Sequence, residues 1–152
     1  MAAQTIPTPV ILEAGETQLN VFRADKSRYW RDHGIMAVAL MALAGVVLWL
    51  IDSPYPAIGS LGAILAVGVR AAYLSSEVLR MQWVLTDRRL ILPSGVRSVN
   101  LLEIDKARQL LGDVQVITRS GDKHLMKHLA DGSGVVTGIL AARDARGRAI
   151  GR

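Results

Sequence analysis

Two apolar runs separated by five residues constrain this chain more than any other feature. Residues 34–51 and 57–69 carry no charged side chain, and the Asp-Ser-Pro-Tyr-Pro segment between them, residues 52–56, is long enough only for a tight reversal. With the apolar residues that flank it, each run approaches the roughly 20 positions that a helix needs to cross about 30 Å of hydrocarbon. The sequence therefore predicts a two-helix transmembrane hairpin over residues 34–76.

Cations lie on both sides of the predicted hairpin and not within its connection. They include Arg23, Lys26, Arg28 and Arg31 before the first helix, and Arg80, Arg88, Arg89 and Arg97 after the second. Short loops rich in Lys and Arg stay on the cytoplasmic side of a membrane. We therefore expect an integral protein of the inner (cytoplasmic) membrane with both termini in the cytoplasm.

Small residues recur on both predicted helices. They are Gly59, Gly62 and Ala66 on the second helix, and Ala42 and Gly45 on the first. Small side chains let two helix backbones approach closely, so these five are the candidate helix-packing residues. Packing within the hairpin explains them at least as well as dimerisation does, and a homo-oligomer stays an alternative.

The rest of the chain predicts one small soluble domain built mainly of β-strands. From Met81 onward, short apolar or alternating stretches are separated by turn residues at intervals of about 8–12 residues, which is typical of an antiparallel sheet or barrel. About six strands are expected, followed by a helix of about ten residues that Asp131 caps. The predicted domain covers residues 78–145, and residues 146–152 are predicted as a basic tail.

The N-terminal segment is predicted to complete this domain. Residues 1–33 form a cytoplasmic arm, within which residues 16–22 alternate and include the β-branched and aromatic types that favour a strand. Because both termini are expected at one membrane face, this strand can pair with an edge of the sheet that would otherwise be exposed.

Several short motifs follow one another in a characteristic order. They are residues 83–92 (WVLTDRRLIL), 94–95 (SG), 101–104 (LLEI) and 111–116 (LGDVQV), with residues 12–16 (LEAGE) ahead of the two apolar runs. In this order they resemble the bacterial membrane-anchored PH-like domain family. The resemblance implies a small, partly open antiparallel β-barrel closed at one end by the C-terminal helix. It also implies a binding or scaffolding role, and it supplies no active-site residues.

Residue types that could carry catalysis or bind a cofactor do not form a recognisable pattern. The chain has no cysteine, and it contains neither a nucleophile-elbow sequence nor a phosphate-binding glycine loop. His124 and His128 would lie about 13 Å apart on a strand, too far for one metal ion. We therefore expect a protein that is not an enzyme, with no catalytic residue, cofactor or metal.

Positive charge beside a bilayer is the remaining functional signal. Residues 78–152 contain 13 Lys and Arg against 7 Asp and Glu. Anionic headgroups attract such a domain by about 1 kcal/mol for each nearby cation, although inside-positive topology alone would enrich the same residues. Arg80, Arg88, Arg89 and Arg97 are the candidate contacts for lipid or for a partner. Nucleic acid is not expected, because the domain lacks an exposed basic and aromatic pattern.

These features predict a non-catalytic, membrane-anchored PH-like module. It would bind a membrane or cytoplasmic protein at the cytoplasmic membrane face, as an assembly or accessory subunit of a membrane complex. The alternative is a lipid-responsive or transport-associated component that acts as an oligomer. Polar residues inside the helices would favour that alternative, and they are scarce.

Overall fold

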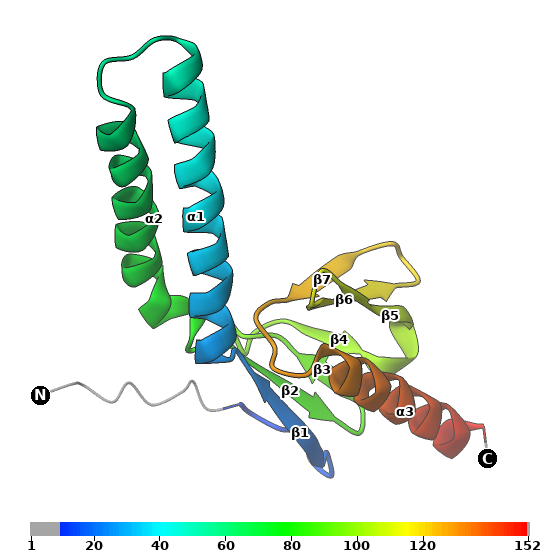
Figure 1. The fold of residues 1–152 in the computed structure, drawn as a ribbon. Coiled ribbons are helices and arrows are strands. Elements are labelled where there is room, and N and C mark those ends of the chain that lie inside the picture. Colours follow the sequence, from blue (N-terminus) through cyan, green and yellow to red (C-terminus); the bar gives the residue numbers. More distant parts are fainter. Residues whose placement is uncertain (1–9, 152) are drawn as a thin grey trace, which may run out of the picture. The chain divides into compact units, whose positions relative to one another are not determined.

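The computed structural model describes residues 10–151 and divides into two compact units (Figure 1). One unit is Asp25–Leu79, which we call the hairpin. The other joins the segment that ends at Ala24 to the segment that begins at Arg80, and we call it the β unit.

The hairpin consists of two long helices, α1 (Lys26–Leu50) and α2 (Pro56–Val78). Asp25 caps α1, since its Oδ1 accepts a hydrogen bond of 2.7 Å from the Arg28 amide. Residues 26–33 were predicted to lie in the arm on hydropathy alone, but α1 already begins at Lys26, directly after its cap.

Both helices are long and apolar enough to cross a membrane, and in the most apolar part of each helix few or no residues are fully buried. Tyr29 is an exception, because its side chain is buried between the helices. Its hydroxyl donates to the Ala71 carbonyl oxygen at 2.8 Å and so ties the start of α1 to α2.

The β unit contains two antiparallel sheets, a short 3₁₀ helix and a C-terminal helix. The first sheet has the order β1 (Gln18–Arg23), β2 (Gln82–Thr86), β3 (Arg89–Ile91), β4 (Ser98–Asn100); the second has β5 (Ile104–Leu110), β6 (Asp113–Thr118), β7 (Lys123–Met126). Between the sheets lies η1 (Leu101–Glu103), and α3 (Gly132–Ile150) follows β7. The prediction of an antiparallel β domain with a C-terminal helix is confirmed. The described residues do not form a closed barrel, because no ladder joins the two sheets.

One hydrophobic core lies between the two sheets and α3 (Figure 1). Every second residue of β6 is buried, at Val114, Val116 and Thr118, as expected for a strand with one face on the core. Ile139 of α3 is fully buried in the same cluster. The helix therefore supplies part of the core and is not an appendage.

The predicted N-terminal strand is confirmed. β1 pairs antiparallel with β2, with Gln18 opposite Thr86 and Phe22 opposite Trp83. Phe22 is buried in the core cluster, so the segment before the hairpin completes the domain that follows it.

The predicted basic tail is wrong for the residues that the structure describes, because α3 continues to Ile150. Asp131 caps the helix as expected, and its Oδ1 accepts from the Gly134 amide at 2.9 Å. Ala and Arg, which have high helix propensity, extend it beyond the predicted ten residues. Arg143 also holds the helix in place by donating from Nη1 to the Asp105 carbonyl oxygen at 2.8 Å.

Candidate functional site

The strand register gives the first sheet of the β unit two distinct ends. Arg23 pairs with Gln82 at one end of the β1–β2 ladder, and Gln18 pairs with Thr86 at the other. The first end adjoins Ala24 and Arg80, the points where the β unit meets the hairpin segment of the chain. We call this the anchor end and the opposite one the distal end.

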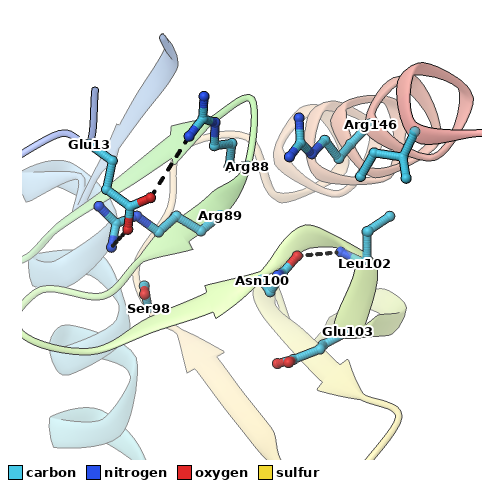
Figure 2. A pocket seen from close by; sticks show the side chains of 9 residues that line it. Glu13, Arg88, Arg89, Ser98, Asn100, Leu102, Glu103 and Arg146 are labelled. Carbon is cyan, nitrogen blue, oxygen red and sulfur yellow. Dashed lines mark hydrogen bonds and ion pairs between the residues drawn. The ribbon is translucent and has the colours of Figure 1, made fainter. Parts of the chain in front are cut away.

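A polar groove of about 480 Å³ lies beside Arg88 and Arg89 at the distal end of the β unit (Figure 2). The β2–β3 turn, β4, η1 and the last turns of α3 contribute to it. The lining side chains are Glu13, Arg88, Arg89, Ser98, Asn100, Leu102, Glu103, Arg146 and Ile150. Three arginines and two glutamates therefore line one concave surface, which makes it the candidate site.

A buried ion pair supports one wall of this groove. The Glu16 side chain is fully buried and meets the Arg89 guanidinium in a two-bond fork, with Nε 3.0 Å from Oε1 and Nη2 2.9 Å from Oε2. Such paired, charge-assisted hydrogen bonds fix the orientation of both side chains. Arg89 thus has a structural partner in the β unit itself.

Thr86 and the main chain complete the surroundings of the Glu16 carboxylate. The buried Thr86 hydroxyl lies 2.7 Å from Glu16 Oε1, and it accepts from the amides of Arg88 and Arg89 in the β2–β3 turn. The Glu13 amide donates to Glu16 Oε2 at 2.8 Å. Thr86 therefore caps the β2–β3 turn.

These contacts hold Glu16 in its ionised form. Hydrogen bonds from Arg89, assisted by those from the Glu13 amide and Thr86, outweigh the effect of burial and lower the pKa of Glu16 from 4.5 to about 2. The same pair raises the pKa of Arg89 above its ordinary value. Both groups are therefore charged at every physiological pH.

The N-terminal segment is fastened to the β2–β3 turn by further bonds. Asp87 Oδ1 accepts from the Thr17 amide at 2.8 Å, and Arg88 Nη2 donates to the Gly15 carbonyl oxygen at 3.2 Å. Glu13 makes longer ion pairs with Arg88 and Arg89, at 3.9 and 3.4 Å. Residues 12–16 and 86–89, which belong to two of the motifs in the family resemblance, therefore meet in space.

The four arginines that are the candidate contacts for lipid or a partner lie at two ends of the first sheet. Arg88 and Arg89 lie at the distal end. Arg80 precedes β2, and Arg97 follows the β3–β4 turn, where its carbonyl oxygen accepts from the Leu92 amide, so both lie at the anchor end. Arg80 and Arg97 are exposed, whereas Arg88 and Arg89 are half-buried in the contacts described above.

Arg146 is a groove residue that the sequence analysis missed. Its side chain is half-buried, and it makes no ion pair or hydrogen bond with any of residues 10–151. Figure 2 shows its guanidinium extending from α3 toward the side of the groove where Arg88 lies. No pattern in the sequence indicated a role for Arg146, and the residue was therefore predicted to belong to the basic tail.

Two of the five predicted helix-packing residues lie at the contact between α1 and α2. A Cβ atom on Gly59 would clash with the Leu48 side chain, and one on Gly45 would lie 2.9 Å from Ser60 Oγ. Gly62 has nothing within 4 Å of that position, and Ala42 and Ala66 are exposed. These last three residues therefore lie on the exposed surface of the hairpin.

The groove offers guanidinium donors and carboxylate acceptors. Guanidinium groups bind carboxylates and phosphates in charge-assisted pairs. Within residues 10–151, no three His, Asp or Glu side chains come together in a group that could hold a metal ion. Comparisons with protein-family models, with curated proteins and with solved structures found no match for this chain.

Proposed function

We propose that this protein is a non-catalytic, membrane-anchored PH-like module that binds an acidic segment of a protein partner in the distal groove. The observation that carries the proposal is Arg146, a half-buried cation that faces the groove without a partner among the described residues. The PH-like assignment is supported by seven strands followed by a C-terminal helix, the number that a barrel of this family normally uses.

Membrane anchoring is supported by the length and the surface of the hairpin. At 1.5 Å per residue, α1 with 25 residues and α2 with 23 residues are each long enough for about 30 Å of hydrocarbon. Large apolar side chains such as Leu43, Val47 and Leu61 are exposed along both helices. Soluble proteins rarely expose a continuous apolar surface of this kind.

The choice of an acidic partner follows from the charges around the groove. Glu13 and Glu16 already pair with Arg88 and Arg89, and Asp87 Oδ2 lies 3.9 Å from the buried Arg88 Nε, whereas Arg146 has no acidic partner among residues 10–151. A carboxylate that enters from outside can pair with the Arg146 guanidinium on the side of the groove where Arg88 lies. The Glu16–Arg89 pair beneath them keeps the groove in shape before the partner arrives, which reduces the entropic cost of binding.

A protein segment suits this position better than a lipid headgroup does. The groove lies toward the distal end, whereas the chain continues into the hairpin from the anchor end. The second candidate, a lipid-responsive or transport-associated oligomer, is favoured by one observation. Gly62, Ala42 and Ala66 leave small residues on the hairpin surface, where another helix could pack closely.

Reporter fusions test the proposed topology. A reporter that is active only in the cytoplasm should be active when it is fused after Arg152. A reporter that is active only on the outer side of the membrane should be active when it is inserted at Ser53. The reason is that cations flank the hairpin and are absent from residues 52–56. A C-terminus on the outer side of the membrane would contradict the proposal that the β unit lies at the cytoplasmic face.

Site-specific photo-crosslinking in native membranes tests partner binding. A photoreactive residue at Leu102, inside the groove, should form an adduct with a protein segment rich in Asp or Glu, and one at the exposed Val96 should not. Replacing Arg146 by Glu should weaken the adduct by about tenfold or more, since a hydrogen bond to a charged group contributes about 1.5–3 kcal/mol.

Arg148→Glu is the matched control, because Arg148 lies on the same helix, is exposed and does not line the groove. It should leave the adduct unchanged. Equal losses in the two variants would indicate a general charge effect and would contradict the groove proposal, as would an adduct at Leu102 that consists of lipid.

A further inference from the structure

The turn between β5 and β6 places an apolar residue in an unfavourable and fully exposed position. Leu111 has a φ of 51°, Gly112 has a φ of 92°, and the Leu111 side chain is 98% exposed. Two successive positive φ values are typical of a turn that prefers Asn-Gly, and leucine is an uncommon residue at such a position. The exposed Leu111 side chain is available for a contact outside the β unit.

This turn lies at the anchor end of the β unit. Asp113, next to Gly112, accepts a hydrogen bond of 2.9 Å from the His128 amide. The following residue, Leu129, forms a β-bridge with Ala24, where the chain passes into the hairpin segment. The apolar tip and the point of attachment are thus linked through adjacent main-chain contacts.

A second turn exposes an apolar residue at the same end. Val96 follows Gly95 in the β3–β4 turn and is 88% exposed. Arg97 stands beside it, and Arg80 is also exposed at this end. Two carboxylates lie near these cations. Asp113 accepts a hydrogen bond from the His128 amide, and Asp131 accepts one from the Gly134 amide.

We propose that the anchor end of the β unit rests on the membrane surface, with Leu111 and Val96 inserted into the interfacial layer and Arg97 and Arg80 on anionic headgroups. Apolar side chains next to cations are the combination that binds such a surface. This proposal rests on the membrane anchoring of the proposed function and adds a second, surface contact to it.

Single cysteine probes can test this contact in the full chain, which has no cysteine of its own. Leu111→Cys, labelled with an environment-sensitive fluorophore, is reconstituted into vesicles of phosphatidylcholine with and without phosphatidylglycerol. A quencher carried on the lipid acyl chains reports contact with the bilayer. Leu19→Cys is the matched control, because Leu19 is apolar and exposed but lies near the distal end. Leu43→Cys, on the exposed surface of α1, reports whether the hairpin is inserted.

The label at position 111 is expected to shift its emission to the blue and to lose intensity with the lipid-borne quencher, more strongly when phosphatidylglycerol is present. The label at position 19 should show neither change. If the label at position 43 is quenched but the labels at positions 111 and 19 are not, the hairpin is inserted and only the proposed surface contact is overturned. If the label at position 43 is not quenched, membrane anchoring itself is overturned. A label at 111 that is shielded from water but not quenched by lipid would mean that a protein or a second copy covers the tip, and would also overturn the proposed surface contact.

Leu111→Asn separates membrane contact from folding. Asn tolerates the left-handed conformation, so this variant should unfold at an equal or higher denaturant concentration than the native chain. A fluorophore at Leu110, which adjoins the turn, should nevertheless lose its lipid quenching in the variant. Unchanged quenching would show that Leu111 does not hold the turn at the bilayer.

Discussion

Replacing Glu16 by Gln is expected to lower the free energy of unfolding of the β unit by about 3 kcal/mol at pH 7. The neutral amide would leave the Arg89 guanidinium without its two-bond partner and would present an NH₂ group where Arg89 Nε and Nη2 now donate. Removing one member of such a pair costs more than the pair contributes, because the other charge, here the half-buried Arg89, is left without its partner.

The same substitution should change the response to acid. The pKa of Glu16 is lowered to about 2, so between that pH and about 4.5 the unfolded chain binds a proton that the folded chain does not. The stabilisation from Glu16 is therefore complete above about pH 5 and is lost as the pH falls toward 2. In Glu16→Gln the loss of stability between about pH 5 and 2 should be smaller, and hydrogen bonds that lower the pKa of Asp131 account for part of what remains.

Denaturant unfolding of the full chain in detergent can measure both effects. Trp83 is buried in the β unit and reports on it alone when Trp30 and Trp49 are replaced by Phe. Glu13→Gln is the matched control, because its side chain is 61% exposed and its ion pairs are longer. It should cost no more than about 0.5 kcal/mol. Similar losses in the two variants would contradict a special role for Glu16.

Features that depend on neighbouring residues were predictable from this sequence. The two apolar helices follow from uninterrupted hydropathy, and the β2–β3 hairpin follows from apolar stretches on both sides of a polar turn. The helix ends were less predictable. Hydropathy predicted the apolar part of α1 but not its start after the cap Asp25. The last turns of α3 were not predicted, because the charged residues near the C-terminus have no apolar periodicity.

The candidate site depends on contacts that no local pattern encodes. Glu16 and Arg89 are 73 positions apart and meet only because β1 pairs with β2. The signal for this contact was the presence of both segments among the motifs of the family resemblance. Arg80 and Arg88 show the opposite case, because they are close in the sequence but lie at opposite ends of one strand. Charge counts could not distinguish these ends.

Removal of residues 1–23 is expected to prevent folding of the β unit while the hairpin still inserts. The truncation removes β1, so the β2 main chain loses its ladder partner, and it also removes Phe22 from the core and Glu16 from Arg89. Loss of a buried Phe costs about 3–5 kcal/mol, and loss of the ion pair a similar amount. Together these approach the whole stability of a small domain, about 5–15 kcal/mol.

The emission of Trp83 provides the measurement, since this residue lies opposite Phe22 on β2 and should become exposed in the truncated chain. A peptide of residues 10–24 added in trans should restore the buried emission, because it supplies β1 and Glu16 together. The same peptide with Glu16→Gln should restore it only at higher concentration. A truncated chain that keeps Trp83 buried without any peptide would show that β2–β7 and α3 fold unaided, and that β1 only covers an edge of a finished domain.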